Sequence, residues 1–85
     1  MNIEQIEKDM QLLHGKKVAV NMGLRGKTIL TVIGELSFTY VEEIDEFSAM
    51  VYNDNCDLSF PAEDIKEIDK NIPSDWPIDA EIYLK

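Results

Sequence analysis

The sequence predicts a small, mainly β domain that begins with one α-helix. A single segment at the start repeats its apolar residues at helical spacing. The remainder alternates apolar and polar residues with a period of two, and Gly, Pro, Asn and Asp interrupt it at short intervals. The 85 residues, 45% of them hydrophobic, suffice for one folded domain with a limited core. Within the single domain 1–85 we expect a helix over residues 1–15, a β-rich body over 16–69, and a loop with a terminal strand over 70–85.

The N-terminal helix is expected over residues 2–14. Its apolar residues recur every three or four positions and form a single stripe: Ile3, Ile6, Met10 and Leu13. Asn2 is suited to cap the first turn, and Gly15 is suited to end the helix in the left-handed conformation. We expect the stripe to pack against the core rather than to form the seam of a dimer.

The segments with a period of two predict strands joined by short turns. These segments cover residues 18–22, 28–40, 47–51, 58–60, 65–68 and 82–84. Gly34 lies within the longest segment and predicts a bend or bulge there. Pro61 ends the fourth strand, and the AEDI motif after it predicts one helical turn. Trp76 lies in a proline-containing loop and is expected to fold back over the core, an exposed contact being the alternative.

The stretch VAVNMGLRGKTILTV, residues 18–32, contains Gly-Lys-Thr and therefore invites comparison with a phosphate-binding P-loop. A P-loop needs a glycine five positions before the Gly-Lys pair, where this chain has Asn21. It also needs a following helix whose N-terminus faces the phosphate, whereas Ile-Leu-Thr-Val favours a strand. We therefore expect a hairpin turn at residues 23–27 and no P-loop.

Other candidate motifs fall short of a catalytic or metal-binding site. Residues 53–64 place oxygen ligands as a calcium loop does, but Leu58 replaces the required glycine and Asp64 replaces the bidentate Glu. His14 and Cys56, the only His and Cys, are too few for a zinc site and are expected at a helix end and in a turn rather than as a catalytic dyad. The carboxylates of residues 42–46 are expected to form a solvated face rather than an acid–base pair. The sequence thus predicts a non-enzymatic protein with no cofactor and no metal.

Acidic and basic residues are distributed unevenly along the chain. Residues 1–27 contain five bases and three acids, whereas residues 28–85 contain three bases and fourteen acids, which gives a net charge of −9. No Lys or Arg occurs between Thr28 and Ile65. Such an anionic surface repels nucleic-acid phosphates and attracts basic proteins. Because the chain has one cysteine, an acidic N-terminal segment and no long apolar run, we expect a cytoplasmic protein that does not enter the membrane.

The order of three short motifs resembles the Sm-like family of small β-barrels, including its YolD-like branch. The motifs are KKVAV, TVIGEL and LSFPAEDIKEI, and the resemblance covers about residues 12–69. It implies a strongly bent, partly open antiparallel β-barrel that can assemble into homo-oligomers through its edge strands. Many Sm-like proteins bind RNA through basic and aromatic loop residues. Residues 40–64 contain acids and no bases, so direct nucleic-acid binding is not expected here.

The first functional hypothesis is a non-enzymatic inhibitor or regulator that occludes a basic surface of a partner protein. Phage and mobile-element proteins that counter host nucleases often have this profile, and the partner's surface would then be one that binds nucleic acid. The acidic residues expected to contact the partner are Glu42, Glu43, Asp45, Glu46, Asp54, Asp57, Glu63 and Asp64. An acidic face that serves only solubility is the simpler interpretation.

The alternative hypothesis is an oligomeric Sm-like module that binds a small anion such as a nucleotide, or a peptide, between its subunits. The basic residues expected to hold the anion are Lys16, Lys17, Arg25 and Lys27. The same residues could instead balance the acids within the molecule.

Overall fold

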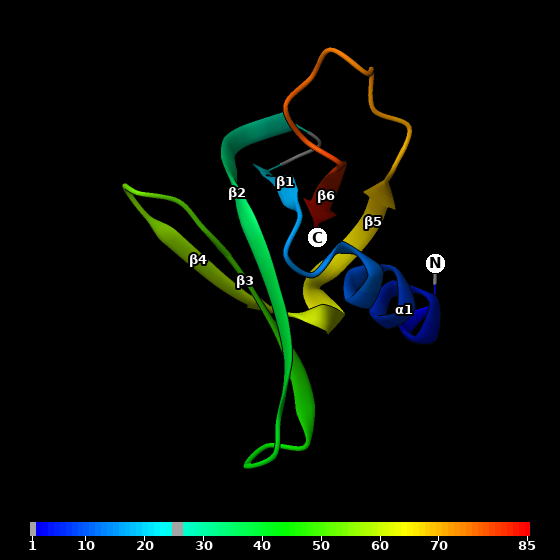
Figure 1. Ribbon diagram of the computed structural model, residues 1–85. Coiled ribbons are helices and arrows are strands. Elements are labelled where there is room, and N and C mark those ends of the chain that lie inside the picture. The colour runs from blue at the N-terminus through cyan, green and yellow to red at the C-terminus, as the bar shows by residue number, and fades with distance from the viewer. Residues whose placement is uncertain (1, 25–26) are drawn as a thin grey trace.

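The computed structural model describes residues 2–24 and 27–85 of the chain (Figure 1). Within these residues one α-helix is followed by six strands, with a short 3₁₀ helix between the fourth and fifth strands. The elements are α1 (Ile3–Leu13), β1 (Lys17–Leu24), β2 (Lys27–Val41), β3 (Glu46–Tyr52), β4 (Asp57–Pro61), η1 (Ala62–Asp64), β5 (Ile65–Asp69) and β6 (Ala80–Leu84). The predicted mainly β class with an N-terminal helix is confirmed, as is the helical turn after Pro61.

The two ends of α1 are set by Asn2 and Gly15. The Asn2 side chain accepts a hydrogen bond of 2.9 Å from the Gln5 backbone N–H, which satisfies one of the free donors of the first turn. Gly15 has a φ of 82°, the left-handed conformation in which glycine commonly ends a helix. The helix residues that enter the core are Ile6, Met10 and Leu13. In the described part of the chain, no helix has the length and apolar content that crossing a bilayer requires.

The six strands form one open sheet in the order β4–β3–β2–β1–β6–β5. Neighbouring strands are antiparallel except β1 and β6, which run parallel, so the predicted all-antiparallel arrangement is wrong for the terminal strand. Ala80 and Ile82 of β6 are fully buried opposite Val18 and Val20 of β1, and this burial holds β6 between β1 and β5. Because β4 and β5 are the two edges, the described strands do not close into a barrel.

The long strand β2 connects the two halves of the sheet and curves along its length (Figure 1). Its first part pairs with β1 as far as Glu35, and its second part pairs with β3 from Glu35 onward. Gly34 lies at this change of partner, and a Cβ at position 34 would overlap the backbone of Tyr52. Glycine is therefore required for the close approach of β3. The register irregularity lies in β1, between Met22 and Gly23, rather than at Gly34.

Trp76 does not fold back over the core, contrary to expectation. Its side chain is 49% exposed, whereas Ile78 is 9% exposed and is the residue of this loop that is buried. The backbone N–H of Trp76 donates to the Pro73 carbonyl at 3.0 Å, so residues 73–76 form a turn, and the indole lies outside it. The chain then attaches to β1 through a 2.7 Å hydrogen bond from the Asp79 N–H to the Lys17 carbonyl.

Candidate functional site

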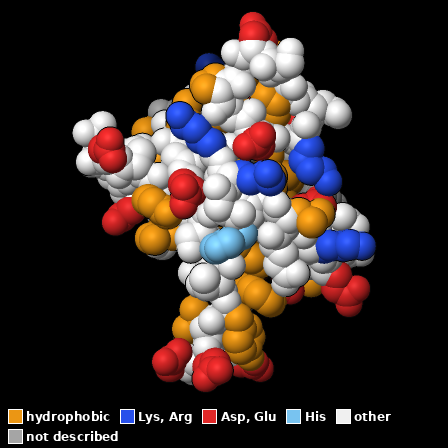
Figure 2. All heavy atoms as spheres, viewed as in Figure 1, with side chains coloured by type: hydrophobic (Ala, Val, Ile, Leu, Met, Phe, Trp, Pro, Cys, Tyr) orange, Lys and Arg blue, Asp and Glu red, His pale blue; other side chains and the backbone are white. Residues whose placement is uncertain are grey.

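Four of the predicted acidic residues lie together at the tip of the β2–β3 hairpin. Val41 pairs with Glu46, so the turn between the strands consists of residues 42–45, and all of residues 42–46 are exposed. The acids at this tip are Glu42, Glu43, Asp45 and Glu46. Asp45 has a φ of 53°, a left-handed conformation that Asp tolerates better than most residues. The hairpin projects from the rest of the molecule, and acidic side chains cover its end (Figures 1 and 2).

Two further predicted acids, Glu63 and Asp64, belong to η1 and are exposed. Strand β4 runs antiparallel to β3 and ends with Pro61 opposite Ser48, near the start of β3. The chain therefore enters η1 near the first residues of β3, on the tip side of the hairpin, and Glu63 lines the same groove as Asp45. The structure thus brings Glu63 of η1 to the hairpin, while Asp64, the next residue, accepts a hydrogen bond of 2.8 Å from the Lys85 N–H through its backbone carbonyl.

Asp54 and Asp57 do not belong to this face, so the predicted set of eight acids is divided. Both lie at the β3–β4 turn, where Asp57 pairs with Tyr52 at the end of β3, whereas Glu46 is at its start. A strand of seven residues spans roughly 20 Å, which separates the two groups of acids. The sequence could not predict this division. Residues 42–46 and residues 54–57 are separated by only a few positions in the sequence, but an extended strand places them at opposite ends of β3.

A groove with apolar walls and acidic residues lies between the start of α1, the hairpin and η1. Its volume is about 380 Å³, at the lower end of the range for ligand pockets. The apolar lining residues are Ile3, Tyr40, Phe47, Pro61 and Ala62, and the acidic ones are Glu7, Asp45, Glu46 and Glu63. Glu7 was not among the predicted site residues. Its place four positions after Ile3, on the same helix face, is the sequence signal that could have identified it.

The groove exists because two apolar stripes continue beyond the core. On β2, Phe38 is 6% exposed, while Tyr40, next on the same face, is 47% exposed. On α1, Ile6 is 4% exposed, while Ile3, one turn earlier, is 46% exposed. Phe47 of β3 joins the core to the groove, since its ring stacks on Phe38 at 4.8 Å and meets the ring of Tyr40 at 5.4 Å, inclined by 66°.

The predicted basic corner is not formed by Lys16, Lys17 and Lys27. Lys17 pairs with Glu35 at the start of β1, whereas Lys27 pairs with Leu24 at its end, so β1 separates them. The prediction failed because Lys17 begins β1 and Lys27 begins β2, and the antiparallel register places these two residues at opposite ends of the strand pair. Arg25, the fourth predicted base, lies outside the described residues.

Lys27 instead lines a second cavity of about 490 Å³ with Lys66 and Lys85. These two lysines come from the C-terminal half of the chain and were not among the predicted site residues. Glu67 also lines the cavity, so its wall carries both signs of charge. The meeting of three lysines depends on the pairing of β5 and β6, which local sequence patterns do not reveal.

A polar network that crosses β2, β1 and β6 borders the second cavity. Thr31 Oγ1 donates to Asn21 Oδ1 at 2.7 Å, and Asn21 Nδ2 donates to Glu81 Oε2 at 3.2 Å. The hydroxyl of Tyr83 donates to the same carboxylate oxygen at 2.5 Å. This hydrogen bond, with burial and the negative charge of Glu81 adding to it, raises the pKa of Tyr83 to about 12. The side chains of the network satisfy one another, which indicates a role in holding β6 in place.

His14 and Cys56 occupy separate structural positions. His14 Nδ1 accepts a hydrogen bond of 3.0 Å from the Phe38 backbone N–H, which joins the end of α1 to β2. Cys56 is exposed in the β3–β4 turn, where its backbone N–H donates to Asn53 Oδ1 at 3.0 Å. Among residues 2–24 and 27–85, no group of three or more His, Cys, Asp or Glu side chains is arranged to hold a metal ion.

No protein-family model, no curated protein and no solved structure matches this chain. The groove beside the acidic hairpin combines an apolar lining, exposed aromatic surface and a concentration of one charge.

Proposed function

We propose that the protein is a non-enzymatic regulator that binds and occludes a basic surface of a partner protein, a surface that otherwise holds nucleic acid. The observation on which this rests is the gathering of acids from two separate segments at one end of the molecule. The hairpin tip and η1 together present Glu42, Glu43, Asp45, Glu46, Glu63 and Asp64. We call these six residues the acidic end.

The charges of the acidic end are available to a partner. Within residues 2–24 and 27–85 the only ion pair joins Lys70 to Asp9, so the described bases do not neutralise the hairpin acids. A projecting cluster of one sign attracts a complementary surface, raises the association rate, and weakens with added salt. The same charges repel nucleic acid, which is why the proposed ligand is a basic protein rather than the nucleic acid itself.

The proposal is tested by reversing charge at the acidic end and, separately, elsewhere. The test variant is Glu42→Lys, Glu43→Lys, Glu46→Lys. The matched control, Asp54→Lys, Asp57→Lys, Asp75→Lys, changes the net charge equally at exposed sites away from the hairpin tip. Each immobilised protein is incubated with nuclease-treated lysate and eluted with increasing salt. We expect a basic protein to be retained by the wild type and the control and lost from the test variant. Equal loss from both variants would attribute retention to net charge and contradict the proposal.

The Sm-like resemblance supplies a second, structural proposal. The curved β2 and the position of η1 between β4 and β5 support it. The parallel strand β6, inserted between β1 and β5, departs from the expected antiparallel arrangement. If the chain assembles like an Sm-like module, analytical sedimentation will give an oligomeric mass. A monomer at all concentrations would remove the intersubunit sites of the alternative function.

The second cavity gives that alternative a specific location, since Lys27, Lys66 and Lys85 meet there. A small anion such as a nucleotide would be held by their ammonium groups. Equilibrium dialysis with labelled ATP tests this directly. Binding that is lost in Lys66→Met and retained in Lys16→Met would favour the second cavity, whereas the reverse would favour the start of β1.

A further inference from the structure

We infer that the groove beside the acidic end binds an amphipathic cationic segment of the partner, with an apolar side chain inside the groove and Lys or Arg side chains on its acidic residues. This inference rests on the proposed function and names the chemistry of the partner surface. It also adds Ile3, Glu7, Tyr40 and Phe47 to the contact residues, none of which belongs to the acidic end.

The apolar part of the groove has the features of a protein-binding surface. Ile3 and Tyr40 are each exposed by nearly half although they continue stripes whose next members are buried. Tyr40 and Phe47 hold each other at 5.4 Å, so the aromatic surface is fixed before a ligand arrives. Partly exposed aromatic residues that are anchored by packing are frequent centres of protein interfaces.

The acidic part of the groove selects the charge of the occupant. Asp45 and Glu46 come from the hairpin, Glu63 from η1 and Glu7 from α1, so carboxylates line the groove from each of the three elements that form it. An apolar segment without cations would remove water from these carboxylates and offer them no positive charge in return, which is energetically costly. Lys and Arg side chains satisfy both requirements, because their aliphatic stems cover apolar surface while their charged ends reach the carboxylates. An Arg or Lys over the ring of Tyr40 would add a cation–π contact.

A second copy of this chain is the less suitable occupant. Two copies that join through the same groove would form an isologous interface, in which each acidic residue approaches the acidic set of the other copy. Each chain also carries a net charge of −9, so the electrostatic interaction between two copies opposes this contact. The charge of the groove therefore favours a cationic partner over self-association.

The test compares two labelled helical peptides with the same number of Lys and Arg residues. One peptide presents Leu and Trp on its other face, and the second has Ala at those positions. We expect the first to bind the wild type about tenfold more tightly, the ratio that corresponds to one well-buried apolar contact. The protein variant Ile3→Ser, Tyr40→Ser should abolish that difference. The matched control Leu12→Ser, Leu30→Ser, which removes apolar groups that are also exposed but lie outside the groove, should retain it.

The outcomes separate this inference from the proposed function. If both peptides bind equally and Ile3→Ser, Tyr40→Ser has no effect, while charge reversal at the acidic end still abolishes binding, the groove inference is wrong and the proposed function stands. If neither peptide binds, or if charge reversal has no effect, the proposed function fails with it. A third outcome is that the mass of the wild type in solution rises with concentration while that of Ile3→Ser, Tyr40→Ser stays monomeric. That result would identify a second copy as the occupant and overturn the inference.

Discussion

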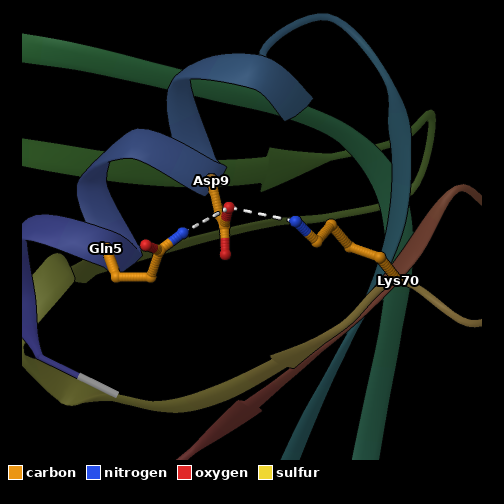
Figure 3. A network of polar contacts seen from close by, with 3 residues as sticks. All are labelled: Gln5, Asp9 and Lys70. Carbon is orange, nitrogen blue, oxygen red and sulfur yellow. Dashed lines mark hydrogen bonds and ion pairs between the residues drawn. The ribbon is translucent and has the colours of Figure 1, made fainter.

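Lys70 and Asp9 join the segment after β5 to the middle of α1, with Lys70 Nζ 3.1 Å from Asp9 Oδ1 (Figure 3). Asp9 is 3% exposed, and Gln5 Nε2 donates to the same oxygen at 3.1 Å. A buried carboxylate requires such donors, because an unpaired charge in this position is costly. The pair therefore keeps α1 against the sheet, and with it the position of Ile3 and Glu7 in the groove.

Removal of Lys70 is expected to destabilise the fold more than removal of both members of the pair. Lys70→Ala leaves Asp9 buried with one donor and should lower the free energy of unfolding by about 1–2 kcal/mol, less than for a fully buried pair because the Lys70 side chain is 53% exposed. The double variant Asp9→Leu, Lys70→Ala removes the buried charge as well, so its free energy of unfolding should fall by less than that of Lys70→Ala. Urea unfolding of both variants measures the difference. A double variant that is less stable than Lys70→Ala would contradict this interpretation.

Gly34→Ala is expected to be severely destabilising. The added Cβ would overlap the Tyr52 backbone and force β2 and β3 apart, at a cost of about 3 kcal/mol or more. Gly15→Ala provides the comparison, because Gly15 has free space around it and only its left-handed φ of 82° opposes a side chain. That change should cost about 1–2 kcal/mol. Thermal unfolding compares the two variants. If Gly15→Ala lowers the unfolding temperature more than Gly34→Ala, the close approach of β3 does not explain the glycine at position 34.

Stability should fall with rising pH between pH 10 and about 12 because of Tyr83. Its pKa is raised from 10.0 to about 12 by the Glu81 carboxylate, so below pH 10 the hydroxyl is protonated in both the folded and unfolded states. Between these values the unfolded state loses the proton while the folded state keeps it, and each further rise in pH favours unfolding. The free energy of unfolding of Tyr83→Phe should therefore decline less steeply over this interval than that of Tyr40→Phe. Tyr40→Phe is the control, because it leaves the contact between Tyr83 and Glu81 intact. Equal slopes in urea unfolding would contradict the assignment.

Local patterns in the sequence predicted the elements well. The stripe of Ile3, Ile6, Met10 and Leu13 identified α1, although Ile3 lies outside the core. Gly34 predicted a bend or bulge, and β2 does curve (Figure 1), but the register irregularity lies between Met22 and Gly23 of β1. The AEDI motif after Pro61 predicted η1. These features depend on neighbouring residues, whose spacing and conformational preferences are visible in a single chain.

The arrangement of strands and charges could not be predicted in the same way. The parallel pairing of β6 with β1 joins Ala80 to Val18 across most of the chain, and no local period specifies it. The pairing of β6 with both β1 and β5 also brings Lys66 and Lys85 to the same cavity as Lys27. The division of Asp54 from the acidic end likewise follows from strand direction rather than from composition.

NMR titration of the labelled protein tests most directly whether a cationic amphipathic segment enters the groove. On addition of the Leu- and Trp-bearing cationic peptide, we expect the largest chemical-shift changes at Ile3, Tyr40, Phe47 and Glu63, with little change at residues 53–57. Changes spread over all acidic surfaces in proportion to their charge, or centred on residues 53–57, would contradict the claim and reduce the acidic end to a general electrostatic surface.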